Sequence, residues 1–271
     1  MIHVISGKGA LPVPSDFWIL RPFNTLFWIM SGAVLLLLLL ASLLLRTKSE
    51  CVRKTVLVAA CVLTSVGFFV YKVYLSLDAE YNVAYAAMGG FNWWGELPLH
   101  LCNINMLLIP VAVLTGSRPL KGFCFFVAPL GALMALLMPG TGFSGYSLLL
   151  PRMLGYHGTH CMVLLEGLAL ASFGLYRPRF RDLPGVVLMI LAIAFGIFLI
   201  DTAIRLSGLN PKANYFFAVE TEGNALLELF YRLIPFPFLY LLPCTGILVP
   251  YMLLITLPFA IADRKREKSA A

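Results

Sequence analysis

The twelve-residue run VLLLLLLASLLL, from Val34 to Leu45, is the strongest structural signal in the chain. It extends an apolar stretch that starts near residue 24 and holds no charged side chain. A helix needs about 20 such residues to cross the hydrocarbon core of a bilayer, where it satisfies its own main-chain hydrogen bonds. Hydrophobic residues make up 60% of the chain and charged residues only 12%. Together these features exclude a water-soluble domain.

Apolar stretches of similar length recur along the chain and predict an all-α fold, a polytopic membrane protein with about seven transmembrane helices. They form a single integral membrane domain over residues 1–271, because no polar segment between them is long enough to fold alone. We expect prolines to kink the last span. The expected spans cover about residues 24–45, 54–76, 97–114, 120–138, 153–175, 183–204 and 234–262.

Basic residues are divided unevenly between the two sides of the expected bundle. The linkers after the first, third and fifth spans, together with the C-terminal tail, carry 13 of the 20 Lys and Arg residues. Cytoplasmic segments are enriched in these residues, which places the N-terminus outside and the C-terminus in the cytoplasm. The third and fifth spans then both begin at the outer face. The formal net charge of +7 has the same origin, so we expect no nucleic-acid partner.

The six cysteines do not follow a structural pattern. They lack a CxxC spacing and fall mostly inside apolar segments, which argues against a disulfide framework and against a zinc knuckle. The first seventeen residues, MIHVISGKGALPVPSDF, have no basic region before a short apolar core, so we do not expect a signal peptide. The cysteines are Cys51, Cys61, Cys102, Cys124, Cys161 and Cys244.

One polar segment leads directly into an apolar span. The segment from Phe91 to Asn105, FNWWGELPLHLCNIN, contains a Glu, a His, a Cys and three Asn. Polar groups inside a bilayer are costly and usually functional. A buried thiol is more often inert packing, but His100 and Asn103 beside Cys102 favour a nucleophile. With a helix starting at residue 97, Cys102 lies roughly 7 Å below the start of the helix at 1.5 Å per residue.

The start of the fifth span, GYHGTHC, supplies a candidate partner for this thiol. His157 and His160 are one helical turn apart and share a face. The expected orientation puts both at the depth of Cys102. A thiol beside an imidazole can form the thiolate that attacks carbonyl carbon. The alternative is that the histidine pair only makes hydrogen bonds at the membrane interface.

The outer loop before the last span contains further candidates. Asn214 and Tyr215 are expected to bond a substrate carbonyl or headgroup, and Asn103, Asn105 or Asn214 is a candidate donor to an oxyanion. Two other polar intrusions lie deeper in the bundle. Glu166 points away from His160 by helical phase. Asp201 and Arg205 are four residues apart in the sixth span, and we expect them to form a structural ion pair.

The sequence LPLHLC at residues 97–102, the histidine-rich start of the fifth span and the NY pair at residues 214–215 resemble the YwaF-like family of bacterial integral membrane proteins. They also resemble its animal relative, transmembrane protein 164. The resemblance covers most of the chain from the second span onward. It implies a protein of the bacterial cytoplasmic membrane and, by analogy, a Cys-dependent transfer of fatty acyl chains onto ether phospholipids. The matching catalytic pair is Cys102 in LPLHLCNI and His160 in YHGTHC.

Three functions are consistent with these residues. The first is an acyltransferase or lipid ester hydrolase without a cofactor, in which Cys102 attacks a membrane lipid and His160 is the general base. His100, His157 and Tyr215 would then contact the substrate. The second is a transporter, channel or lipid- or solute-binding receptor with the same polar pocket. The third is a metal-dependent hydrolase with His100, His157 and His160 as ligands, although no HExxH pattern is present.

Overall fold

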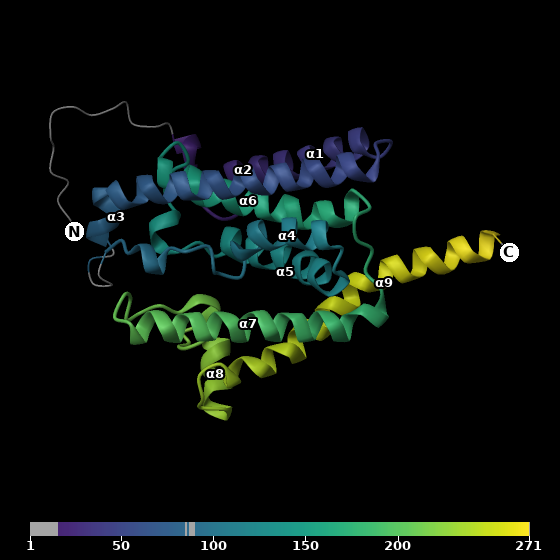
Figure 1. Ribbon diagram of the computed structural model, residues 1–271. Helices are drawn as coiled ribbons and strands as arrows, with labels where there is room; N and C mark the ends of the chain where they lie inside the picture. The colour runs from purple at the N-terminus through teal and green to yellow at the C-terminus, as the bar shows by residue number, and fades with distance from the viewer. Residues whose placement is uncertain (1–15, 85, 87–89, 271) are drawn as a thin grey trace.

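The computed structural model describes residues 16–84, 86 and 90–270 of the chain (Figure 1). The first fifteen residues, about which the sequence raised the question of a signal peptide, lie outside these. The helices of the described part are α1 Thr25–Leu45, α2 Glu50–Leu77, α3 Ala79–Ala84, α4 Ile104–Thr115, α5 Arg118–Leu137, α6 Pro151–Ser172, α7 Leu183–Leu206, α8 Ala225–Leu233 and α9 Thr245–Ala270. Short 3-10 turns include η3 Trp93–Gly95, η4 Thr141–Phe143, η6 Tyr215–Phe217 and η7 Leu239–Cys244. The only regular strands described, β1 Ile19–Leu20 and β2 Tyr146–Ser147, pair antiparallel.

The all-α membrane class predicted from the sequence is confirmed. Within the described residues, five helical segments are long and apolar enough to cross a membrane. Two of the seven expected spans are too short or too polar to be counted among them, so the structure does not support seven spans. One corresponds to α4, which has only 12 residues. The other corresponds to α6, whose 22 residues include Arg152, two histidines and Glu166. The five segments are Thr25–Leu45, Glu50–Leu77, Arg118–Leu137, Phe180–Leu206 and Leu239–Ser269.

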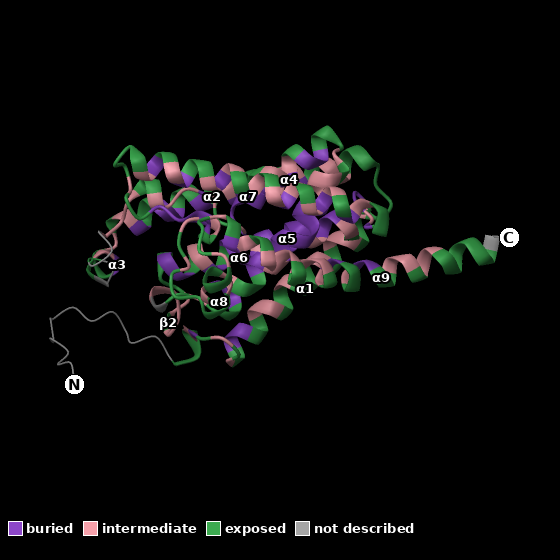
Figure 2. Cartoon of the chain, turned by 90° about the horizontal axis from the view of Figure 1, so that it is seen from below, coloured by how far each residue is buried: buried purple, intermediate pink, exposed green. Residues whose placement is uncertain are grey.

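The centre of the bundle is formed by α5 and α6, with α2 and α4 packed against α6 and α4 also against α5. Buried residues follow α5 closely, whereas α1 and α9 are mostly exposed or half-buried (Figure 2). Of the most apolar part of each helix, 67% of the residues in α5 are buried inside the protein and none in α1. Exposed leucines are stable on α1 because lipid tails replace water as the surrounding medium.

The third expected span begins later than the sequence predicted. Residues 96–103 form bends and turns, and α4 starts at Ile104. Pro98 has no N–H to donate, and the Leu97 N–H bonds the Tyr215 hydroxyl at 3.0 Å instead of a helical carbonyl. Cys102 therefore precedes the helix and does not lie inside it. Non-helical backbone at membrane depth is tolerated where protein encloses it.

The last expected span also differs. The chain from Ile234 to Phe238 is not helical, and α9 begins only at Thr245, after the 3-10 turn η7. Pro235 and Pro237 thus break the chain and do not merely kink a helix, because closely spaced prolines remove several main-chain donors. Pro250 is accommodated inside α9.

Candidate active site

The turn before α4 brings Cys102 against α6. The Cys102 Sγ and the His160 Nε2 are 3.3 Å apart, across 58 residues of sequence. Both side chains are enclosed by protein, with 8% of Cys102 and 5% of His160 exposed. The structure therefore joins the starts of the third and fifth expected spans, the contact on which the catalytic hypothesis depends.

The second ring nitrogen of His160 determines which tautomer is present. Its Nδ1 lies 2.7 Å from the main-chain carbonyl oxygen of Tyr156, one turn earlier in α6. A carbonyl only accepts hydrogen bonds, so Nδ1 must carry the proton. In the neutral ring Nε2 then has its lone pair free and faces the thiol of Cys102. This is the arrangement that a general base for the thiol requires.

Main-chain groups also surround the sulfur atom. Cys102 lies two residues before α4, where the first N–H groups of a helix carry partial positive charge. The main-chain amides of Cys102 and Asn103 lie beside the sulfur and favour its charged form. On the other side, a Cβ added to Gly131 of α5 would lie 3.2 Å from the Cys102 nitrogen and 3.4 Å from its Cα. The absence of a side chain at Gly131 lets α5 support the turn directly.

Tyr215 holds the chain just before Cys102. Its hydroxyl donates to the Trp94 carbonyl at 2.9 Å and accepts from the Leu97 N–H at 3.0 Å. Its own N–H donates to the Asp201 carboxylate of α7 at 3.0 Å. Burial raises the pKa of the Tyr215 hydroxyl, so the hydroxyl keeps its proton and remains a donor. Tyr215 was predicted to contact substrate, and here it positions the segment that carries Cys102.

A buried ion pair fixes the same segment from α2, and the sequence interpretation did not include it. The Lys72 ammonium contacts the Glu96 carboxylate, with 9% and 19% of the two side chains exposed. The Tyr81 hydroxyl donates to the other Glu96 oxygen at 3.0 Å. Lys72 also lies over the rings of Phe68 and Tyr71, at 5.1 and 4.7 Å from their centroids. The signal that could have revealed this pair is a lysine inside the second apolar span.

The other two histidines take different places. His157 is buried, and its Nε2 donates to the Phe143 carbonyl at 3.0 Å, while its Nδ1 has no partner in the described part of the chain. His100 is exposed, and its ring packs edge-on against Tyr215 with centroids 4.9 Å apart. Among the described residues, no three His, Cys, Asp or Glu side chains are grouped as metal ligands.

The three candidate asparagines separate into two groups. Asn103 and Asn105 are buried beside Cys102, and the Oδ1 of each lacks a partner among described residues. The Asn105 Nδ2 donates to the Leu101 carbonyl at 2.7 Å. Asn214 instead organises its own loop, because its Nδ2 donates to Glu220 and Glu222 at 2.8 and 2.7 Å. Asn103 and Asn105 are thus buried close to Cys102 along the chain, whereas Asn214 is committed to its own loop.

The prediction of an ion pair between Asp201 and Arg205 is wrong, because the two side chains bond other partners. The Arg205 guanidinium bonds the Glu220 carboxylate at 2.6 Å and the Ala213 carbonyl at 2.6 Å. Asp201 accepts from the Tyr215 N–H. The loop after α7 folds back and competes for both side chains, which spacing within one helix does not reveal.

Comparison with known proteins gives one match. The model of the family described as the TMEM164 family matches residues 21–256, well over half of the chain. The matched range includes every residue of the site described above. No curated protein and no solved structure matches the chain.

Proposed function

The chain belongs to the TMEM164 family, and we propose that it transfers or hydrolyses the acyl chain of a membrane phospholipid through Cys102 and His160. One observation carries this proposal. The Sγ and Nε2 atoms are 3.3 Å apart, and the bond from Nδ1 to the Tyr156 carbonyl leaves Nε2 as the proton acceptor. The nucleophile Cys102 thus contacts the base His160, and the Tyr156 carbonyl orients that base, as in other enzymes that activate a thiol.

The reaction begins when Nε2 of His160 takes the proton of the Cys102 thiol. The thiolate attacks the ester carbonyl carbon, forming an S–C bond, while the carbonyl π electrons move onto oxygen. Collapse of this intermediate breaks the C–O bond to the leaving alcohol, which receives the proton from Nε2. The acyl thioester is then attacked by an acceptor hydroxyl or by water, which gives its proton to Nε2. The S–C bond breaks, and the thiol is restored with that proton.

The negative charge on the intermediate oxygen needs donors close to the sulfur. We propose that the main-chain amides of Cys102 and Asn103, at the start of α4, provide this stabilisation. The side chains of Asn103 and Asn105 are further candidates, since both are buried here with an oxygen that lacks a partner in the described structure. His157, with its free Nδ1, is a candidate contact for the bound ester.

We also propose seven crossings, with α4 and α6 as the two shorter or more polar ones, an outer N-terminus and a cytoplasmic C-terminus. Basic residues at one end of the bundle support this orientation. There Arg53 bonds the Phe173 carbonyl, Lys121 bonds the Leu175 carbonyl, and Arg177 bonds Asp263 of α9. Enrichment in basic residues marks the cytoplasmic end. The Cys102 site then faces the outer leaflet of the bacterial cytoplasmic membrane, as the resemblance to the YwaF-like family implies.

Intact-protein mass spectrometry tests the chemistry. The purified protein is incubated with an activated acyl lipid and with thiol-reactive probes, beside Cys102→Ala and His160→Ala. A hydroxylamine-sensitive acyl adduct on Cys102, absent in Cys102→Ala and slowed in His160→Ala, is the expected result. If no adduct forms while all three proteins bind lipid equally, the site is a binding pocket of a transporter or receptor and not an active site.

A further inference from the structure

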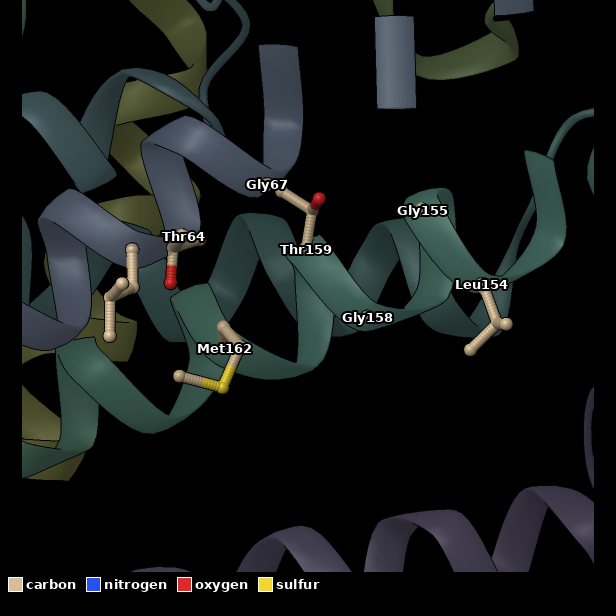
Figure 3. Close-up of a pocket in the computed structure, with 8 residues that line it drawn as sticks. Thr64, Gly67, Leu154, Gly155, Gly158, Thr159 and Met162 are labelled. Carbon is tan, nitrogen blue, oxygen red and sulfur yellow. The ribbon is translucent and has the colours of Figure 1, made fainter. Parts of the chain in front are cut away.

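A cavity of about 290 Å³ lies between α2 and α6. Figure 3 shows its lining, with Thr64 and Gly67 on α2 and Gly155, Gly158 and Thr159 on α6. His160 faces the thiol of Cys102, whereas its neighbour Thr159 lines this cavity. The cavity is therefore separate from the reacting pair, on another face of the same helix.

Glycines leave room in the cavity. A Cβ added to Gly67 or to Gly158 would meet no heavy atom within 4 Å, so both positions open onto empty space. Gly155 instead allows close packing, because a Cβ there would lie 2.2 Å from the Tyr71 ring. One glycine thus brings α2 and α6 together while the two others keep space open beside the contact.

A buried hydroxyl is directed into this space. Only 7% of Thr159 is exposed, and its hydroxyl has no hydrogen-bond partner in the part of the chain that the structure describes. Thr64, on the opposite wall, is already committed, since its hydroxyl donates to Glu166 at 2.5 Å. A hydroxyl that faces hydrocarbon without a partner is unfavourable. Thr159 therefore has an unused donor that a ligand carbonyl can accept.

The rim of the cavity is apolar and lies at the surface of the bundle. Leu63 and Leu154 line it, and 70% and 52% of these side chains are exposed. The lining contains no charged residue. Because this surface belongs to helices that cross the membrane, the medium outside the rim is hydrocarbon. Lipid chains are thus present at the opening at high concentration.

The lining indicates a lipid chain as the occupant. Apart from Thr64 and Thr159, it consists of leucine, glycine and methionine. A hydrocarbon chain that carries one ester carbonyl matches this combination of an apolar surface and a single unpartnered hydroxyl.

We propose that this cavity binds one ester-linked acyl chain of a membrane glycerolipid, with the Thr159 hydroxyl donating to the ester carbonyl oxygen. The methylene chain lies over Gly67 and Gly158 and leaves past Leu63 into the bilayer. This binding does not require Cys102 to react, so it goes beyond the proposed acyl chemistry. It gives α6 a bound lipid on a face other than the one that carries His160.

Photocrosslinking in nanodiscs tests the proposal. The full chain is reconstituted with phosphatidylglycerol that carries a diazirine on one acyl chain, and adducts are mapped by peptide mass spectrometry. We expect adducts on Leu63, Leu154 and Met162 in the unmodified protein. They should be lost in Gly67→Leu and in Gly158→Leu, whose new side chains fill the cavity without a clash at Cβ. Gly196→Leu on α7, which also meets nothing within 4 Å, is the matched control and should keep them.

A second variant removes the hydroxyl while retaining the shape. Thr159→Val should lower the adduct yield about fivefold, the factor that one neutral hydrogen bond is typically worth. The proposal is overturned if the cavity-filling variants label as well as the unmodified protein, or if no adduct maps to the cavity. Repeating the labelling with Cys102→Ala separates this result from the acyl chemistry, because that variant cannot form a thioester.

Discussion

Helices α1 and α6 are almost equal in length, with 21 and 22 residues, but they are opposite in character. The apolar part of α1 has no charged residue and none of it is buried inside the protein. In α6 the polar side chains Arg152, His157, His160 and Glu166 are all buried. An apolar helix can rely on lipid as its partner, whereas a helix with polar groups needs protein around it. The chemistry that we propose accordingly uses His160 of α6, the helix that hydropathy alone does not identify as a span.

The largest expected effect concerns His160, on the polar helix of this contrast. His160→Ala should lower the rate of Cys102 acylation by at least about 100-fold, because a positioned general base contributes that much or more. Time-resolved intact mass spectrometry measures it. Cys161→Ala is the control, since this buried thiol on α6 has no assigned part in the reaction. Equal rates in His160→Ala and the unmodified protein would remove His160 from the mechanism.

Breaking the ion pair that supports the Cys102 segment comes next. Lys72→Met leaves the half-buried Glu96 carboxylate with only the Tyr81 hydroxyl as a partner among the described residues, and we expect a loss of about 3 kcal/mol in the free energy of unfolding, measured by reversible unfolding in SDS. The double variant Lys72→Met with Glu96→Gln should recover much of this loss. The exposed pair Lys54–Glu50 on the same helix, with 33% and 62% of its side chains exposed, provides the comparison. Lys54→Met should change stability little, because exposed pairs are weak. If Lys72→Met and Lys54→Met lower the free energy of unfolding equally, the Lys72–Glu96 pair does not support the Cys102 segment.

A smaller effect is expected from glycines of α5 and α1. The Cβ of Gly131→Ala would press on the main chain of Cys102 and displace the thiol by a few tenths of an ångström. We expect about a tenfold fall in acylation rate with little change in stability, because small misplacements of reacting groups are costly. Gly32→Ala on α1, where a Cβ meets nothing within 4 Å, should leave the rate unchanged. If both variants behave alike, α5 does not support the turn.

The smallest effect belongs to Tyr215. Tyr215→Phe removes the hydroxyl that bonds Trp94 and Leu97, and we expect a loss of about 1 kcal/mol in stability. Burial raises the pKa of this hydroxyl in the folded protein. Above the ordinary value of about 10, the unfolded chain loses the proton while the folded chain keeps it, so stability falls as pH rises. Thermal unfolding in detergent between pH 9 and 11 should show a steeper decline for the unmodified protein than for Tyr215→Phe. Parallel pH curves would exclude this cause.

The sequence predicted the helical class because a run such as Val34–Leu45 needs only its own composition to be recognised. It also predicted that Cys102 and His160 meet, because the two residues lie near the starts of two expected spans that begin at the same face of the membrane. It did not predict the unwound turn before α4, because that turn depends on a hydroxyl 118 residues away in the chain. The partners of Asp201 and Arg205 were misassigned for the same reason. Local spacing describes contacts within one helix but not the competition from a folded loop.

In the seven-crossing arrangement that we propose, the short length of α4 has a consequence for the bilayer. Its lipid-facing side is the exposed stripe Leu107, Val111 and Leu114, which extends only about 10 Å along the helix axis at 1.5 Å per residue. A bilayer core of about 30 Å cannot match so narrow an apolar belt without thinning locally. We therefore expect the headgroups of neighbouring lipids to sink toward the middle of the membrane at this point. Hydrophobic mismatch would then lower the ester linkages of those lipids to the level of Cys102.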